Sequence, residues 1–351
     1  MMASAMLPAV VCCCFVFIAP ESPRWYMSKG RHAAAYEAMT RLRFSKIQAA
    51  RDIFYMFKGL ESEESIKIGG GKVRELLNVP RNRRALIASE LVMFMQQFCG
   101  VNSIAYYSSR IFVDGGFSEQ SALAASLGFG VINWLFAIPA IYTIDTFGRR
   151  NLLLFTLPLL ALCLLLTGFS FWIPREYAEA RVGCVALGIY LYGIFYSPGQ
   201  GPVPFTYSAE AYPLYVRTHG MAISTATLWF FNFVLAITWP SLFVAFKPQG
   251  AFGWYAGWNL LGWWGVLCVM PETRARSLEE LDAVFSVPTR LQAAHGLKQI
   301  PWFVQRYVFR REVELPPLIN FDKARKEGGR VEEIVAGRGS QNVGRRGREG
   351  V

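Results

Sequence analysis

The sequence has few of the residues from which enzyme and metal sites are built. Its three histidines, His32, His219 and His295, all lie outside the long apolar stretches. It contains no glycine-rich nucleotide-binding fingerprint, no His/Cys cluster with metal-ligand spacing and no nucleophile paired with a base. We therefore predict that the protein is not an enzyme, with no catalytic residue, no metal site and no cofactor.

Charge is also scarce. Only 17% of the 351 residues are charged, whereas 53% are hydrophobic, and a soluble domain of this size usually carries more charge. The apolar residues cluster into stretches close to the roughly 20 residues needed to cross a hydrocarbon core. The alternative is a very hydrophobic soluble helical protein, but soluble helices rarely lack charge over such lengths. We therefore predict an all-α integral membrane protein with six full spans and one more at the N-terminus. The stretches are Ala3–Ala19, Leu86–Tyr107, Leu123–Ile144, Leu152–Ile173, Val182–Tyr207, Met221–Phe246 and Ala251–Met270.

The N-terminal stretch could instead be a secretory signal peptide. It has no basic residues at its start, and Pro20–Arg24 does not resemble a small-residue cleavage site. We therefore interpret residues 1–19 as a retained transmembrane helix.

The cysteines do not suggest a disulfide framework. All of them fall within apolar stretches, where a free cysteine behaves as a small hydrophobe. We predict that they are buried and bind no metal. They are Cys12, Cys13, Cys14, Cys99, Cys163, Cys184 and Cys268.

The formal net charge of +11 could suggest a nucleic-acid partner, but its distribution indicates a membrane. Basic residues gather before the second apolar stretch, in alternate links and in the tail, whereas links 108–121, 174–181 and 247–250 are poor in net positive charge. This alternation follows the positive-inside pattern, so we predict that residues 20–85 and the C-terminus are cytoplasmic and that no nucleic acid binds. The basic residues include Arg24, Lys29, Arg31, Arg41, Arg43, Arg81, Arg83, Arg84, Arg149, Arg150, Arg217, Arg274 and Arg276.

We divide the chain into four parts. Residues 1–19 form a transmembrane helix, 20–85 a cytosolic loop with short helices, 86–272 a six-helix transmembrane bundle, and 273–351 a cytosolic C-terminal tail that is partly disordered.

Within these parts, local composition gives finer predictions. Ala33–Leu42 and Val73–Leu77 have helix-forming composition, and Gly69–Gly71 is a flexible break. Residues 328–351 are predicted to be disordered.

Several amides lie where a span should be apolar. In "QQFCGVNSIAYYSS", Gln97 and Asn102 would point about 140° apart on an unbroken helix. Both line one site only if the helix bends or unwinds near Gly100, or if a cavity wraps around it. The alternative is that such amides hold helices together by hydrogen bonds. For the cluster as a whole we favour a cavity.

Other spans add similar groups. Asn133 lies in mid-span, "SPGQGPVPF" at 197–205 must lose backbone hydrogen bonds, and Trp229 and Asn232 follow. Amides pair with hydroxyls and aromatic faces cover the C–H faces of a sugar ring, so this uncharged set suits a neutral, hydroxyl-rich ligand. Glu90 is the exception: it either carries a proton or, as we favour, extends toward Arg83 or Arg84.

Five motifs occur in the order and spacing of the sugar porters of the major facilitator superfamily. They are "PESPRWY", "QQFCGVNSIAYYS", "DTFGRR", "GPVPF…AEAYPLYVR" and "PETRARSLEEL". The chain resembles this family, and its fungal members most, over residues 1–285. The family fold has two six-helix halves, and this chain begins at what resembles the sixth helix. The resemblance therefore implies the C-terminal half of a twelve-helix major-facilitator bundle, without the first five spans.

The resemblance also implies roles for individual residues. One set binds sugar hydroxyls or covers the ring, and a second set forms a cytosolic salt-bridge network that holds the inner gate shut. The first set is Gln96, Gln97, Asn102, Tyr106, Tyr107, Asn133, Gly201, Pro202, Phe205, Trp229 and Asn232. The second is Glu21, Arg24, Asp145, Arg149, Arg150, Glu210, Arg217 and Glu272.

Two positions depart from the family pattern. The family often has tryptophan where Phe205 stands, and some members have an acidic residue where Ser197 stands. The resemblance implies transport of a neutral sugar or polyol across the plasma membrane by alternating access, within a lipid bilayer, with proton symport left open. The alternatives are a sugar sensor that does not transport its ligand, and a fragment that does not function.

Overall fold

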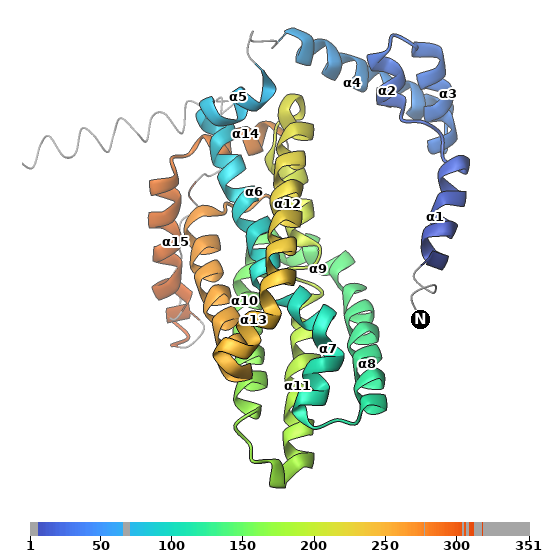
Figure 1. Ribbon diagram of the computed structural model, residues 1–351. Helices are drawn as coiled ribbons and strands as arrows, with labels where there is room; N and C mark the ends of the chain where they lie inside the picture. Colours follow the sequence, from blue (N-terminus) through green and yellow to red (C-terminus); the bar gives the residue numbers. More distant parts are fainter. Residues whose placement is uncertain are drawn as a thin grey trace, which may run out of the picture. The chain divides into compact units, whose positions relative to one another are not determined.

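The computed structural model describes residues 6–65, 71–276, 278–303, 305–306, 309–311 and 318. Within them every regular element is helical, which confirms the predicted all-α class (Figure 1). The chain divides into two compact units, Met1–Gly70 and Gly71–Val351. The predicted disorder of 328–351 lies outside the described residues.

The first unit contains α1 (Met6–Ile18), α2 (Pro23–Ser28), α3 (His32–Leu42) and α4 (Lys46–Ser65). Helices α2, α3 and α4 pack against one another through small apolar side chains, because alanines let neighbouring helices approach closely. The buried apolar residues include Met27, Ala35, Ala38, Met39 and Ala49.

Helix α1 is apolar around its whole circumference. Its 13 residues fall short of the roughly 20 that span a bilayer, and residues 1–5 lie outside the described part, so a span over 1–19 stays a prediction. The expectation that every cysteine is buried holds for Cys99 and Cys163, is only partly met by Cys184 and Cys268, which are half-buried, and is wrong for Cys12, Cys13 and Cys14. They are exposed because α1 leaves side chains on all its faces uncovered.

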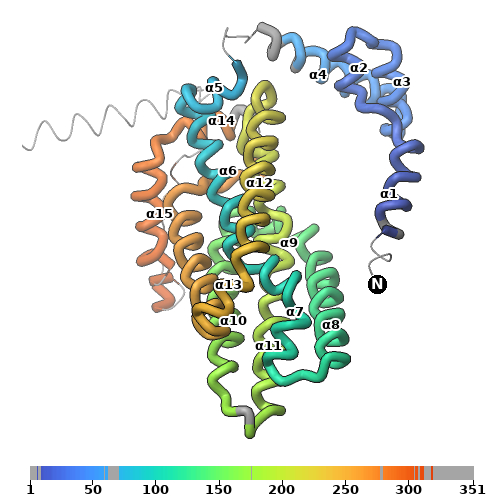
Figure 2. The backbone as a smooth tube through the Cα atoms, in the orientation of Figure 1, coloured from blue at the N-terminus to red at the C-terminus, as the bar shows by residue number. Residues whose placement is uncertain are grey.

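The second unit is a bundle of long helices joined by short turns (Figures 1 and 2). Four helices in its described residues, α8, α10, α11 and α13, are long and apolar enough to cross a membrane. Its elements are α5 (Lys72–Asn78), α6 (Pro80–Phe98), α7 (Val101–Gly115), α8 (Glu119–Ala137), α9 (Ala140–Phe147), α10 (Arg149–Ser170), the 3-10 turn η2 (Arg175–Tyr177), α11 (Ala178–Tyr196), α12 (Val203–Ala211), α13 (Leu214–Val269), α14 (Leu278–Ser286) and α15 (Thr289–Phe303).

The apolar stretches map onto these helices with breaks. The stretch 86–107 becomes α6 and α7, which part at Gly100, and 182–207 becomes α11 and α12, joined by turns at 197–202. Conversely, the two stretches between 221 and 270 run together as α13, interrupted only at Lys247. Proline and glycine explain the breaks after α8 and α11, where Pro139, Pro198 and Pro202 remove backbone donors.

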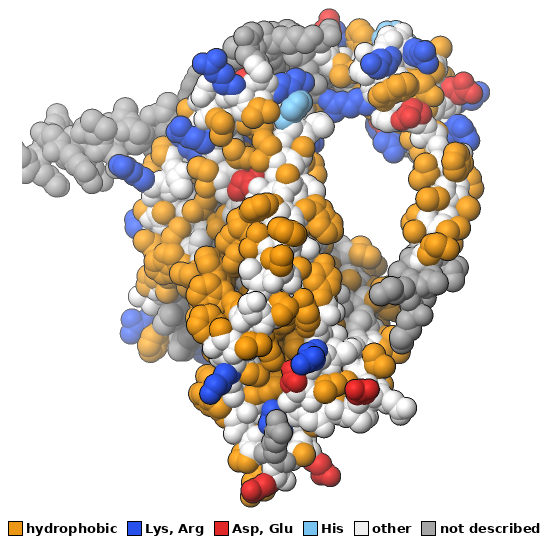
Figure 3. Space-filling view, viewed as in Figure 1, with side chains coloured by type: hydrophobic (Ala, Val, Ile, Leu, Met, Phe, Trp, Pro, Cys, Tyr) orange, Lys and Arg blue, Asp and Glu red, His pale blue; other side chains and the backbone are white. Residues whose placement is uncertain are grey.

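Helix α10 lies at the centre of the bundle, packed against α11 and α13. By contrast, the outer helices expose large apolar side chains, and the face seen in Figure 3 is predominantly apolar between the charged ends of the bundle. So much exposed apolar surface is costly in water but suits hydrocarbon. The exposed residues of these outer helices include Leu127, Trp134, Phe230, Phe233, Ile237, Leu261 and Trp264, and α10 itself exposes Phe155 and Leu162.

Helix α15 lies in the segment that we predicted to be a cytosolic tail, and it packs along α13. Gly296 permits this approach, since a Cβ atom there would overlap the carbonyl oxygen of Leu267. Gln299 Oε1 accepts a hydrogen bond from Arg150 Nη1 at 2.7 Å. The start of the tail is therefore part of the bundle.

The break between α6 and α7 depends on Gly100, whose φ of 98° lies in the left-handed region that glycine adopts at no steric cost. A Cβ atom there would also lie 3.2 Å from the Tyr255 ring. We expect Gly100→Ala to lower the free energy of unfolding by about 1–3 kcal/mol. Thermal unfolding of the purified protein measures this.

The matched control is Gly130→Ala. Gly130 lies within α8, and an added Cβ there would meet no atom within 4 Å. Alanine is the better helix former, so this variant should be neutral or slightly stabilised. Equal unfolding temperatures for the two variants would contradict the argument.

Candidate functional site

The break at Gly100 brings together two side chains that an unbroken helix would separate. Asn102 Nδ2, on α7, donates a hydrogen bond to Gln97 Oε1, on α6. The chain thus bends at Gly100, which is one of the two arrangements that we considered for bringing both side chains to one site. The bend also frees the carbonyl of Cys99, which accepts hydrogen bonds from Tyr192 OH and Asn259 Nδ2, both at 3.0 Å. Distant helices thus satisfy the backbone group that the break leaves open.

Gln97 is the centre of an amide cluster, which we define as Gln97, Asn102, Tyr106 and Asn232. Gln97 Oε1 also accepts from Asn232 Nδ2 on α13 at 3.2 Å, and Asn232 Nδ2 lies 3.3 Å from Tyr106 OH. Gln97 is only 2% exposed, whereas Tyr106 is 56% exposed. The cluster therefore runs from the interior of the bundle to its surface, and it joins α6, α7 and α13.

Three other predicted site residues bond to neighbouring helices. Gln96 Nε2 donates to the carbonyl of Gly201 at 3.3 Å, and Tyr107 OH donates to the carbonyl of Ala236 at 3.0 Å. Asn133 Oδ1 accepts from Ser197 Oγ at 2.6 Å. These bonds hold helices together, so the alternative that we weighed for the amides describes Gln96 and Tyr107 well.

The predicted aromatic residues face outward. Phe205 is 40% exposed and Trp229 is 61% exposed, whereas Gly201 and Pro202 are half-buried in the turns before α12. Phe205 and Trp229 thus expose a phenyl ring and an indole, whose apolar faces suit the C–H faces of a sugar ring.

Glu90 corrects an expectation. Its Oε1 accepts a hydrogen bond from Ser224 Oγ at 2.9 Å, and Ser224 is also bonded to Tyr212 OH. Arg84, which we expected as a partner, donates instead to the carbonyls of Phe285 and Ser286. The Glu90 carboxylate points toward α13 because the Ser224 hydroxyl on that helix lies at the same level as Glu90 on α6.

The sequence argument missed two residues. Ser197 appeared only as a departure from the family pattern, yet it is the partner of Asn133. Gln200 is fully buried, and its Nε2 and Oε1 have no hydrogen-bond partner among the described residues. An unpaired buried amide suits an ordered water or a ligand group. The sequence feature that could have identified Gln200 is an amide side chain within the Pro/Gly-rich segment 197–205.

A second group of residues lies where α10 begins. Arg149 forms ion pairs with Asp145 at 2.8 Å and with Glu210 at 2.7 Å, and Thr273 Oγ1 donates to Glu210 Oε2 at 2.7 Å. The Arg149 side chain is 9% exposed, so little water screens these contacts. The pairs join α9 and α10 to α12.

Glu272 completes this ion-pair network of Asp145, Arg149, Glu210 and Glu272. Its two carboxylate oxygens accept from the backbone N–H groups of Arg149 at 3.0 Å and Arg150 at 3.1 Å, at the N-terminus of α10. A helix N-terminus favours a negative charge. Gly148 allows this approach, because its φ is 92° and a Cβ atom would lie 2.6 Å from Glu272 Oε2.

Two other predicted gate residues make further hydrogen bonds. Arg150 donates to the carbonyl of Leu267 and to Gln299, and Arg217 Nε donates to the carbonyl of Tyr212 at 3.1 Å. Glu21 and Arg24 belong to the first unit, so their part in the network stays a prediction.

Arg81 was predicted only as a loop charge, but it joins three helices. Its Nη1 donates to the carbonyl of Ala211 at 2.7 Å, its Nε pairs with Asp282 at 2.9 Å, and its guanidinium lies over the Phe285 ring. Burial lowers the pKa of the Arg81 guanidinium, and the Asp282 carboxylate opposes that shift.

Comparison with known proteins identifies relatives of this chain. Residues 1–285 match the family described as "Sugar (and other) transporter". The chain is 33% identical over 278 residues to the myo-inositol transporter FST1 of Gibberella moniliformis, covering 77% of this chain and 48% of that protein. It is 33% identical over 316 residues to myo-inositol transporter 1 of Cryptococcus neoformans var. grubii, covering 84% and 54%.

A solved structure of a sugar transporter is also similar to this chain. The chain is similar to the major facilitator superfamily proton:xylose symporter XylE of E. coli, bound to 6-bromo-6-deoxy-D-glucose. The TM-score is 0.65 at 26% identity, and the match covers 81% of this chain and 58% of that one. The chain thus spans about half the length of the curated relatives it matches. These matches confirm the predicted resemblance and its helical fold.

Proposed function

The chain belongs to the sugar (and other) transporter family of multi-pass membrane proteins, and from that premise we propose that it supplies one half of a path that carries a neutral sugar or polyol across a membrane. The half that it resembles is the C-terminal one. Alternating access would rock its bundle against a second bundle, with the substrate between them.

The amide cluster is the observation that carries this proposal. Gln97, Asn102 and Asn232 come from three helices and meet at one oxygen atom, and none of them carries a formal charge. Amides that already bond one another can exchange those bonds for substrate hydroxyls at little cost, because donors and acceptors stay paired. A carboxylate or phosphate substrate would require a fixed positive charge at this position.

The exposed rings and the bonded turns complete the proposed site. Phe205, Trp229 and Tyr106 would cover the apolar faces of the ring, and Asn133 would bind through the oxygen that Ser197 now holds. Gln96 and Tyr107 would shape the site by fixing the α12 turn and α13. Two of the relatives are named as myo-inositol transporters, which favours a cyclic polyol as the substrate.

The ion-pair network is proposed to act as a latch. Its residues tie the ends of α9, α10, α12 and α13 together at one end of the bundle, which by the charge distribution is the cytosolic end. We place the protein in the plasma membrane with a cytosolic C-terminus. XylE is named a proton symporter, and Glu90 is the candidate proton carrier on this chain.

Discrimination between a neutral and a charged ligand tests the proposal. Isothermal titration of the purified full chain in lipid nanodiscs, with myo-inositol and with glucuronate, measures it. We expect myo-inositol to bind at least about tenfold more tightly, because the amide cluster offers no positive charge to a desolvated carboxylate. Equal affinity for the two, or binding of glucuronate alone, would refute a site built for neutral polyols.

A further inference from the structure

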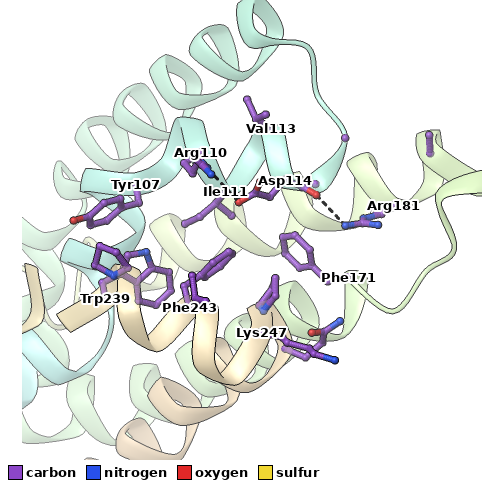
Figure 4. Close-up of a pocket in the computed structure, with 17 residues that line it drawn as sticks. Tyr107, Arg110, Ile111, Val113, Asp114, Phe171, Arg181, Trp239, Phe243 and Lys247 are labelled. Carbon is purple, nitrogen blue, oxygen red and sulfur yellow. Dashed lines mark hydrogen bonds and ion pairs between the residues drawn. The ribbon is translucent and has the colours of Figure 1, made fainter. Parts of the chain in front are cut away.

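A cavity of about 940 Å³ opens at the end of the bundle opposite the ion-pair network, around the kink at Lys247. Figure 4 shows its walls, which come from α7, from the end of α10, from α11 and from α13. Trp239, Phe243 and Phe171 supply aromatic surface, and Arg110, Arg181 and Lys247 supply positive charge (Figure 4).

The three cations come from three links that are far apart in the sequence. Each of those links is poor in net positive charge, yet the fold gathers one cation from each around one hollow. Asp114 is the one acidic side chain among the residues that line it. The lining therefore keeps an excess of positive charge beside an apolar wall.

The cations retain capacity for an anion. Within the described part of the chain, neither Arg181 nor Lys247 forms an ion pair with a carboxylate. Arg181 Nη2 donates to the backbone carbonyl of Asp114 at 2.9 Å, its guanidinium lies 5.2 Å from the Phe171 ring centre, and its buried Nε has no hydrogen-bond partner. Arg110 pairs with Asp114 only at 3.7 Å and is 79% exposed.

Lys247 occupies a backbone conformation that an ordinary side chain avoids. Its φ of 58° and ψ of 169° fall in a region populated almost only by glycine. Glycine would fit this kink without strain, so the backbone does not require lysine. Because strained backbone positions cluster at binding sites, the Lys247 side chain, whose ammonium group borders the cavity, is a candidate ligand-binding group.

We propose that this cavity binds a phosphate-type anion carried on an apolar body, the chemistry that an anionic phospholipid represents. Guanidinium groups recognise phosphate oxygens through paired N–H donors, and the ammonium of Lys247 adds a mobile charge. The aromatic side chains Phe171, Trp239 and Phe243 would hold the apolar portion. The proposal concerns a ligand of opposite character to a polyol, and its three cations are not part of the proposed polyol site, although Tyr107 lines the cavity and belongs to that site as well.

Native mass spectrometry of the purified full chain tests the proposal. The protein is titrated with phosphatidylglycerol and with phosphatidylcholine of the same acyl chains. We expect at least about tenfold tighter retention of phosphatidylglycerol, because only its headgroup carries a net charge for the cations. Competition with millimolar inorganic phosphate separates the two sources. Displacement would indicate that free phosphate also occupies the site, and persistence would indicate the lipid alone.

Lys247→Gly separates ligand binding from folding. The variant loses the ammonium but relieves the strained backbone, so we expect an unchanged or higher unfolding temperature with about tenfold weaker retention of phosphatidylglycerol. Arg181→Gln should weaken retention similarly, and Lys247→Arg should preserve it.

The matched control removes two exposed cations of α15, in the double variant Arg290→Gln and Lys298→Gln, and should retain the lipid as the unmodified protein does. Equal retention of the two lipids by the unmodified protein would overturn the proposal. Undiminished retention by Lys247→Gly would overturn it as well.

Discussion

Gln97→Leu is expected to weaken binding of a neutral polyol by about tenfold to a hundredfold, because a buried polar group left without its partner costs about 1–3 kcal/mol. Leucine has nearly the volume of glutamine but accepts no hydrogen bond. The amides of Asn102 and Asn232 both donate to the Gln97 oxygen, so the substitution leaves two donors unpaired and removes a contact for substrate. Isothermal titration with myo-inositol measures the loss.

The control for this variant is Asn151→Leu. Asn151 is an exposed amide at the start of α10 that bonds only the carbonyl of Phe147, at 3.1 Å. It should bind myo-inositol as the unmodified protein does. If a folded Gln97→Leu variant kept its affinity, the amide cluster would have no role in recognition, and the site would have to be sought among the Asn133 and Gln200 groups.

Arg149→Gln is expected to lower the free energy of unfolding by about 1–3 kcal/mol, because the Arg149 side chain is buried while its partners Glu210 and Asp145 are 27% and 72% exposed to water. Glutamine cannot balance the carboxylates of Asp145 and Glu210, and Glu210 is only partly exposed. Glu272 keeps its hydrogen bonds from the backbone N–H groups of Arg149 and Arg150, which the substitution does not remove. Thermal unfolding in detergent measures the change.

Arg274→Gln is the matched control, because Arg274 is exposed and contributes to this region through its backbone N–H, which the substitution keeps. Surface substitutions of this kind usually change stability by less than about 0.5 kcal/mol. Similar unfolding temperatures for Arg149→Gln and Arg274→Gln would show that the network does not hold the helix ends together.

The features that the sequence predicted are those governed by local chemistry. Long apolar stretches predict the helices, and the glycine between Gln97 and Asn102 made a bend at Gly100 one of the arrangements to consider. The charges at the start of α10 were grouped through the family resemblance, and DTFGRR places Asp145 and Arg149 four residues apart, on either side of Gly148.

The features that it did not predict depend on which helix becomes the neighbour. Ser224 became the partner of Glu90 because α13 passes α6 at that depth, and Gln200 became buried because two turns precede α12. The close packing of α15 requires a glycine at position 296, because a Cβ atom there would overlap the carbonyl oxygen of Leu267. The sequence alone does not show that these two residues are neighbours. Spacing within a segment carries no information about such distant partners.

The docked helix α15 connects the C-terminal segment to the ion-pair network. Gln299 is bonded to Arg150, and the backbone N–H of Arg150 is bonded to Glu272. Displacing α15 would therefore remove a hydrogen-bond partner from Arg150, the residue whose backbone N–H holds Glu272 at the first turn of α10.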